Sequence, residues 1–92
     1  MDNSNWCFEQ DAAGRNVVKH RAPPRFAAYW ASGEGGRPAP GIPCWHDAGS
    51  GADDSLHLFG FQWIDRRPDT EAFDRLMHEA VKAIDAWIAS RL

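Results

Sequence analysis

The sequence predicts an α+β fold, in which a small antiparallel sheet of three or four strands packs against one long C-terminal helix. Three observations support it: a helical stripe of apolar residues over 69–90, an aromatic-rich strand over 55–65, and shorter alternating segments within 5–31. A chain of 92 residues can bury one small core, so we expect a single domain spanning residues 1–92.

The C-terminal helix is the most clearly patterned element. Its apolar residues recur at helical spacing, at Phe73, Leu76, Met77, Ala80, Val81, Ile84, Trp87 and Ile88. Pro68 suits the start of a helix, and Asp69 or Thr70 can cap the first free amides. A helix with so wide an apolar face is stable only against a partner, and we expect that partner to be the sheet.

The segment 55–65, SLHLFGFQWID, is predicted to be a well-covered strand because both of its faces are largely apolar. Regular alternation places Leu56, Leu58 and Ile64 on one face. It places the other large side chains on the opposite face, namely His57, Phe59, Phe61 and Trp63. Gly60, in the middle, indicates a bulge or the close approach of another backbone.

The N-terminal strands are expected within residues 5–31. NWCFEQ alternates, DAAGRN supplies turn residues and VVKHR follows, which together predict a hairpin. The segment RFAAYWAS is compatible with either a strand or a short helix, because Phe26, Tyr29 and Trp30 also fit helical spacing. The alternation of Phe26, Ala28 and Trp30 favours a strand.

Residues 32–54 are predicted to form a long Gly/Pro-rich loop, because they hold six of the eight glycines and three of the six prolines. A loop of this length in a small domain is usually functional or mobile. Trp45 lies in an apolar stretch near its centre, and we expect it to anchor the loop or to present a ring to a ligand. The loop should run into the next strand near Ser55.

Three residues with metal-binding side chains, Cys44, His46 and His57, lie at the end of this loop and the start of the strand. Cys7 could be a fourth ligand if its strand lies beside His57. Zinc sites usually combine two close ligand pairs, and the second pair is missing here. We therefore expect no cofactor and keep zinc binding through Cys44, His46 and His57 as an alternative hypothesis.

The same residues include the thiol and imidazole of a nucleophilic catalyst. A reactive cysteine needs a helix N-terminus or a cationic neighbour to lower its pKa, and Cys44 has only nearby histidines in a Gly-rich loop. The interpretation therefore leans against an enzyme, and no catalytic residue is assigned.

The formal net charge of −3 disfavours nucleic acid as a partner for the domain as a whole. The basic residues cluster in the predicted hairpin, at Arg15, Lys19, His20, Arg21 and Arg25. Nucleic-acid binding through residues 15–25 therefore stays as a third hypothesis.

The expected location is the cytoplasm, in a protein of bacterial type. The first residues lack the basic and apolar regions of a signal peptide, and no apolar run reaches the length of a membrane span. Two cysteines are too few for a disulfide framework.

No motif indicates a known family, and the leading hypothesis is a small non-enzymatic interaction or accessory domain. Eleven aromatic rings exceed what one thin core needs, and exposed aromatics beside arginines are typical of protein-binding surfaces. The expected contact residues are Arg25, Tyr29, Trp30, Arg37 and Trp45. If one apolar face of the 55–65 strand is left uncovered by this chain, a second copy must cover it, which would make a homodimer.

Overall fold

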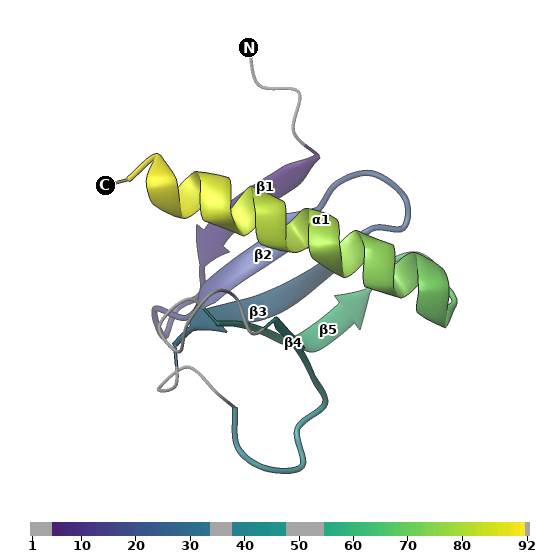
Figure 1. Cartoon of the computed structure of the whole chain (residues 1–92), viewed down its shortest axis with the longest axis horizontal. Coiled ribbons are helices and arrows are strands. Elements are labelled where there is room, and N and C mark those ends of the chain that lie inside the picture. The colour runs from purple at the N-terminus through teal and green to yellow at the C-terminus, as the bar shows by residue number, and fades with distance from the viewer. Residues whose placement is uncertain (1–4, 34–37, 48–54, 92) are drawn as a thin grey trace.

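The computed structural model describes residues 5–33, 38–47 and 55–91, and within them the chain forms one antiparallel sheet crossed by one helix (Figure 1). The strands are β1 (Trp6–Gln10), β2 (Asn16–His20), β3 (Phe26–Ser32), β4 (Cys44–Asp47) and β5 (Leu56–Trp63), and the helix is α1 (Thr70–Ala89). In the sheet the strands lie in the order β1-β2-β3-β5-β4, and every neighbouring pair is antiparallel. The α+β class and the C-terminal helix are confirmed.

The strand count differs from the prediction, because the described residues contain five strands rather than three or four. The additional strand is β4, which lies inside the segment predicted to be a loop and pairs with β5. The ambiguous segment RFAAYWAS is the strand β3. The predicted entry into the last strand near Ser55 is correct, since β5 begins at Leu56.

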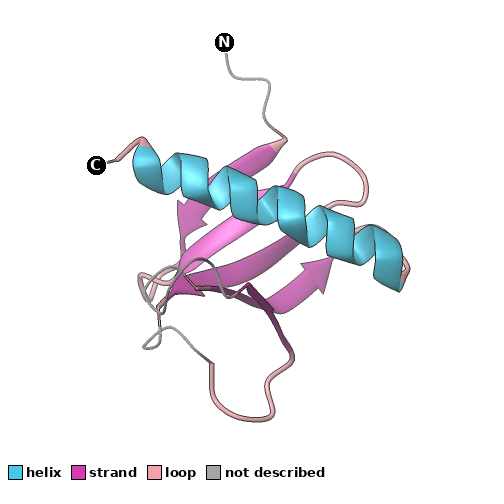
Figure 2. Cartoon of the chain, in the orientation of Figure 1, coloured by secondary structure: helices cyan, strands magenta, loops and turns pink. Residues whose placement is uncertain are grey.

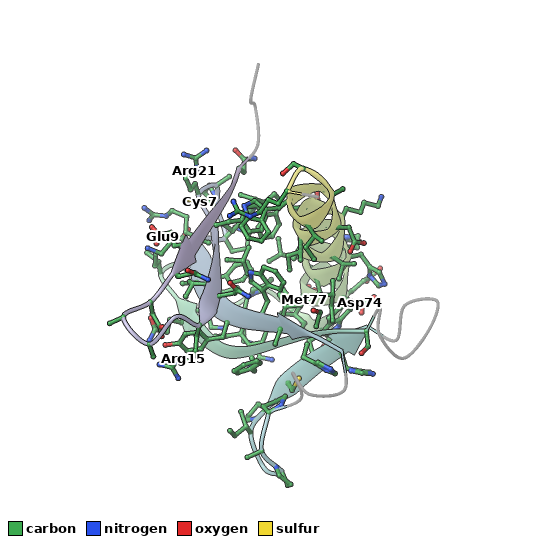
Figure 3. All side chains as sticks on the ribbon, turned by 90° about the vertical axis from the view of Figure 1, so that its left-hand side faces the viewer. Cys7, Glu9, Arg15, Arg21, Asp74 and Met77 are labelled. Atoms are coloured by element: carbon green, nitrogen blue, oxygen red, sulfur yellow. The ribbon has the colours of Figure 1, made fainter. Side chains whose placement is uncertain are left out.

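The helix α1 covers one face of the sheet, as Figures 1 and 2 show. Asp69 caps its first turn, because the carboxylate accepts a hydrogen bond from the Ala72 amide at 2.8 Å. The side chains of α1 that are fully buried belong to the predicted stripe, at Leu76, Met77, Ala80 and Ile84. Figure 3 shows Met77 on the sheet side of the helix, whereas Cys7, Glu9 and Arg15 lie on the opposite side of the sheet.

The core lies between α1 and the sheet face that carries Val18, Phe26, Ala28, Trp30, Leu56 and Leu58. These side chains alternate along β2, β3 and β5, as expected for strands with one face against a helix. Aromatic pairs extend the core: Phe8 stacks on Trp87, and the ring of Trp30 meets that of Trp87 edge-on at 5.6 Å.

A β-bulge at Gly60 changes the direction of the side chains along β5. Tyr29 pairs with Phe59, but Ala27 pairs with Gln62, so Gly60 and Phe61 together face one residue of β3. Gly60 has φ +65°, and a Cβ there would lie 2.8 Å from Cδ2 of Tyr29. Glycine is therefore required both by the backbone conformation and by the ring that covers it.

The bulge also corrects the predicted faces of β5. Phe61 and Trp63 were expected to share a face with His57 and Phe59, but both lie on the helix side and contact Phe73 of α1. The reason is the extra residue, which shifts the alternation by one position. Ile64, which was expected to share the face of Leu56 and Leu58, follows the strand and is 67 % exposed.

The part of the chain that the structure describes contains no helix with the length and apolar character needed to cross a lipid bilayer.

Candidate binding site

The edge strand β4 is shorter than its neighbour β5, and this leaves part of β5 without a partner on that side among the described residues. β4 pairs with β5 only from Leu56 to Phe59, so β5 continues through Gly60–Trp63 without β4. The residues just before β4 are Pro40-Gly41-Ile42-Pro43, and a proline has no amide hydrogen with which to continue the ladder. In Figure 1 the chain leading into β4 runs away from the sheet. Among the described residues, no strand pairs with this edge of Gly60–Trp63.

A hollow of about 520 Å³ lies between the segment that enters β4, the open part of β5 and the start of α1. We call it the aromatic groove, and the side chains that define it are Ile42, Trp45, Phe61, Trp63, Arg67 and Phe73. Its volume lies in the range of about 300–1,000 Å³ that is typical of ligand sites. The four rings, Trp45, Phe61, Trp63 and Phe73, are all half-buried, so each keeps part of its surface exposed.

The rings on the β5 side of the groove form a packed cluster. Phe61 and Trp63 lie nearly parallel, with ring centroids 6.0 Å apart, and Phe73 lies 5.5 Å and 6.0 Å from them. Beneath them is the fully buried Phe26, whose ring centroid is 4.9 Å from that of Trp63. Aromatic pairs of this kind contribute about 0.5–1.5 kcal/mol each beyond the area they bury. The wall is therefore preorganised rather than formed on binding.

Trp45 lines the groove from β4. Its ring meets the ring of His78 on α1 edge-on, with centroids 5.6 Å apart. Trp45 faces the helix because it alternates with Cys44 and His46 along a short strand. Trp45 was predicted either to anchor its segment to the core or to present its ring to a ligand. In the structure the ring is half-buried and lines the groove.

Arg67 is the charged side chain among the described residues that line the groove. Its guanidinium lies over the ring of Phe73, 5.4 Å from the centroid. Four other cations of the described residues have carboxylate partners, namely Arg15, Lys19, Arg25 and Arg75. Arg67 has no ion pair within the described residues, so its charge remains available to a ligand.

A second hollow of about 420 Å³ adjoins the groove and shares Trp45, Arg67 and Phe73 with it. Asp69 and Asp74 line this second hollow. Asp69 is engaged, because it caps α1, whereas Asp74 is exposed and its carboxylate lies 3.5 Å from Nδ1 of His78, a nitrogen that is 2.9 Å from the backbone carbonyl oxygen of Asp74.

Of the four predicted contact residues that the structure describes, Trp45 lines the aromatic groove. Trp30 was expected to remain partly outside, but it is 5 % exposed and packs against Trp87 in the core. Trp30 is therefore left out of the surface proposed below. Arg37 lies outside the described residues.

The other two predicted contact residues lie elsewhere on the sheet. The ring of Tyr29 covers Gly60, and the guanidinium of Arg15 lies 4.4 Å from the centroid of that ring. Arg25 is held by Asp65 through hydrogen bonds of 3.0 Å and 2.8 Å from its Nε and Nη2 atoms. This pairing lowers the pKa of Asp65 to about 2.

His46 and His57 face each other across β4 and β5, with their Nδ1 atoms 2.8 Å apart. Nε2 of His57 lies 3.0 Å from the carbonyl oxygen of Gly33, which can only accept, so this nitrogen donates. In a neutral His57 ring Nδ1 is then the acceptor, and Nδ1 of His46 must be the donor. Since His57 is 1 % exposed, the two bonds satisfy a buried polar side chain and join β4 to β5.

The candidate metal ligands are only partly brought together. The thiol of Cys44 lies 3.4 Å from the carbonyl oxygen of Trp45, and the described residues contain no group of three or more His, Cys, Asp or Glu side chains that could hold a metal. Cys7 could have been a fourth ligand if its strand lay beside His57, but β1 and β5 are separated by β2 and β3. Strands are about 4.8 Å apart, which places Cys7 roughly 14 Å from β5.

The predicted basic hairpin is largely neutralised by its own neighbours. Arg15 pairs with Asp11 at 2.8 Å, and Lys19 pairs with Glu9 at 2.7 Å. The hydrogen bond with Glu9 raises the pKa of Lys19 above its ordinary value. Paired cations present a weak field to phosphate, so the geometry adds no support to nucleic-acid binding.

The sequence reasoning missed Ile42, Phe61, Trp63, Arg67 and Phe73 as groove residues. Phe61 and Trp63 were assigned to the wrong face, and Phe73 was assigned to the helix stripe. A usable signal was present in Pro43, which ends any strand pairing on its N-terminal side and so predicts an open edge opposite.

The chain matches no protein-family model, and neither a curated protein nor a solved structure proved significantly similar to it.

Proposed function

We propose that this protein is a small partner-binding domain, in which the aromatic groove holds an apolar segment of another protein. The observation that carries the proposal is a hollow of about 520 Å³ lined by four half-buried rings and by Arg67, which has no ion pair with any other residue that the structure describes. Aromatic and arginine side chains dominate the energetics of protein interfaces, especially where they line a pocket.

The chemistry of the groove favours binding over catalysis. Its described lining contains rings, aliphatic groups, one thiol and one guanidinium, but no carboxylate or imidazole that could transfer a proton. The two histidines considered for catalysis from the sequence, His46 and His57, are bonded to each other and do not line the groove.

The structure weakens the sequence argument for a homodimer. That argument required β5 to carry large apolar side chains on both faces, whereas the bulge directs Phe61 and Trp63 to the helix side. Phe59 remains on the other face, with its ring centroid 5.8 Å from that of Tyr29. Self-association is therefore an alternative outcome of the test.

The test is a selection of random displayed peptides on the immobilised wild-type protein, followed by affinity measurements with Ile42→Asp and Ile64→Asp. Both isoleucines are exposed, at 46 % and 67 %, but only Ile42 lines the groove. A buried charge in the groove should weaken selected peptides by about tenfold or more, while Ile64→Asp should bind as the wild type does.

Two results would overturn the proposal. In one, no peptide is enriched, or the enriched peptides bind wild type and Ile42→Asp equally well. In the other, sedimentation shows that the wild type is a dimer and that Ile42→Asp is a monomer, which would make a second copy the occupant. Thermal unfolding of both variants verifies that they are folded.

A further inference from the structure

The open part of β5 offers more than side chains. The strand Gly60–Trp63 is paired with β3 on one side, through Ala27 with Gln62 and Phe26 with Trp63. On its other side, no strand of the described residues pairs with it. Unpaired amides and carbonyls along a strand edge form a template for an added strand.

This chain cannot fill the edge by extending β4. In the register of Cys44 with Phe59, the residue that would pair with Gly60 is Pro43, which has no amide hydrogen. Gly41, with φ +93°, also departs from an extended strand, and the amide of Ile42 is used in a turn to Ala39. The edge and the aromatic groove therefore coincide, since Gly60, Phe61 and Trp63 line the groove.

Arg67 places a positive charge at the groove. Its guanidinium lies over Phe73 and has no carboxylate partner among the described residues. Of the two acids that line the adjoining hollow, Asp69 is engaged in the helix cap and Asp74 is exposed beside His78. A carboxylate placed at Arg67 would meet an available cation beside an apolar wall, where such a pair is less screened than on an open surface.

We infer that the partner segment binds as an extended strand added to Gly60–Trp63, with apolar side chains on the rings and a carboxylate at Arg67. The inference rests on the proposed function and specifies the chemistry of its partner. In an added strand, alternate side chains point to the same side, so every second residue of the partner is expected to be apolar.

The first test concerns the charge. The probe is a fluorescein-labelled peptide from the selection above whose binding depends on Ile42 and which contains an acidic residue. Arg67→Glu should weaken it by about tenfold, and replacing the peptide's acid by its amide should weaken it similarly. Arg66→Glu is the matched control, because it makes the same charge change at an exposed neighbour outside the groove, and it should alter affinity by less than about threefold.

The second test concerns the backbone. The same peptide is made with a single N-methyl group at each position in turn. Because alternate amides of a strand point to opposite sides, methylation should abolish binding at every second position and leave the others within a few fold. A uniform response along the peptide would overturn strand addition.

The failures of the two proposals are distinguishable. Peptides that depend on Ile42 but bind regardless of Arg67 and of N-methylation would overturn this inference and leave the partner-binding groove intact. If all the selected peptides lack an acidic residue, the part of the inference that places a carboxylate of the partner at Arg67 is overturned. The absence of any peptide that depends on Ile42 would overturn the proposed function itself.

Discussion

The two halves of β5 are built from similar residues but have different surroundings. Leu56–Phe59 lies between β3 and β4, and its first three residues are buried. Gly60–Trp63 pairs with β3 alone, and its residues alternate between exposed and half-buried. The first half is closed by the chain itself, whereas the second half ends in an edge and a groove.

This difference shows that residue composition does not decide which part of a strand is structural. LHLF has three large apolar side chains and GFQW has two, and both segments direct apolar side chains toward α1. The two segments differ in two ways. LHLF has β4 as a neighbouring strand, whereas Pro43, just before β4, stands opposite Gly60. In GFQW the bulge turns Phe61 and Trp63 toward Phe73. We therefore expect substitutions in the closed half to affect stability first, and substitutions around the open half to affect binding.

The largest stability effect is expected at His57, in the closed half. His57→Phe leaves the carbonyl of Gly33 and the Nδ1 of His46 without the partner that the buried His57 ring provides, which should lower the free energy of unfolding by about 1–3 kcal/mol. His46→Phe should cost less, because His46 is exposed and water can replace part of its bonding. Urea denaturation of both variants measures the difference.

The double variant sharpens this result. If the imidazoles are bonded to each other, the cost of His46→Phe with His57→Phe should be smaller than the sum of the single costs, by about 0.5–1.5 kcal/mol. Strict additivity, or a larger cost at His46 than at His57, would mean that the pair does not join β4 to β5 as described.

The sequence predicted individual helices and strands better than it predicted which strands lie beside one another. The stripe from Phe73 to Ile88 and the cap at Asp69 required only local rules, so α1 is where periodicity places it. β4 has four residues, too few for alternation to be recognised, and its strand state depends on pairing with β5 rather than on local preference.

The candidate site depended on the same non-local information. Gly60 was identified as a bulge candidate, but only the register with β3 shows that Phe61 and Trp63 move to the helix side. Trp45 was singled out from the sequence and its ring lines the groove. Arg67 stood out in no sequence pattern, because its lack of an ion pair among the described residues is a property of the folded surface.

The next effect is expected at the junction of the two halves. Gly60→Ala places a Cβ at φ +65° and 2.8 Å from Cδ2 of Tyr29, and it should cost about 1–2 kcal/mol. Gly14→Ala is the matched control, since φ is +83° there but a Cβ would meet nothing within 4 Å. Thermal and urea unfolding should show the larger loss for Gly60→Ala. Equal losses would mean that the ring of Tyr29 does not restrict this position.

The smallest effect on stability is expected at the end of the open half. There Asp65, just after β5, is hydrogen-bonded and ion-paired to Arg25, just before β3. The side-chain hydrogen bond from Arg25, together with that from its amide, lowers the pKa of Asp65 from 3.8 to about 2. Because the pKa in the folded protein is below that of the unfolded chain, the pair stabilises the fold at pH above about 4, and this contribution is lost as the pH falls toward about 2. The pair is exposed, so its contribution is modest.

Asp65→Asn should therefore lower stability slightly at neutral pH and should reduce the steepness with which stability falls between about pH 4 and pH 2. Some acid dependence must remain, since a backbone hydrogen bond from Arg15 also lowers the pKa of Asp11. The measurement is the urea midpoint of wild type and variant at a series of pH values. Parallel curves for the two proteins over that interval would show that the carboxylate of Asp65 is not paired with Arg25 in solution, and that the open half is held to β3 by its backbone alone.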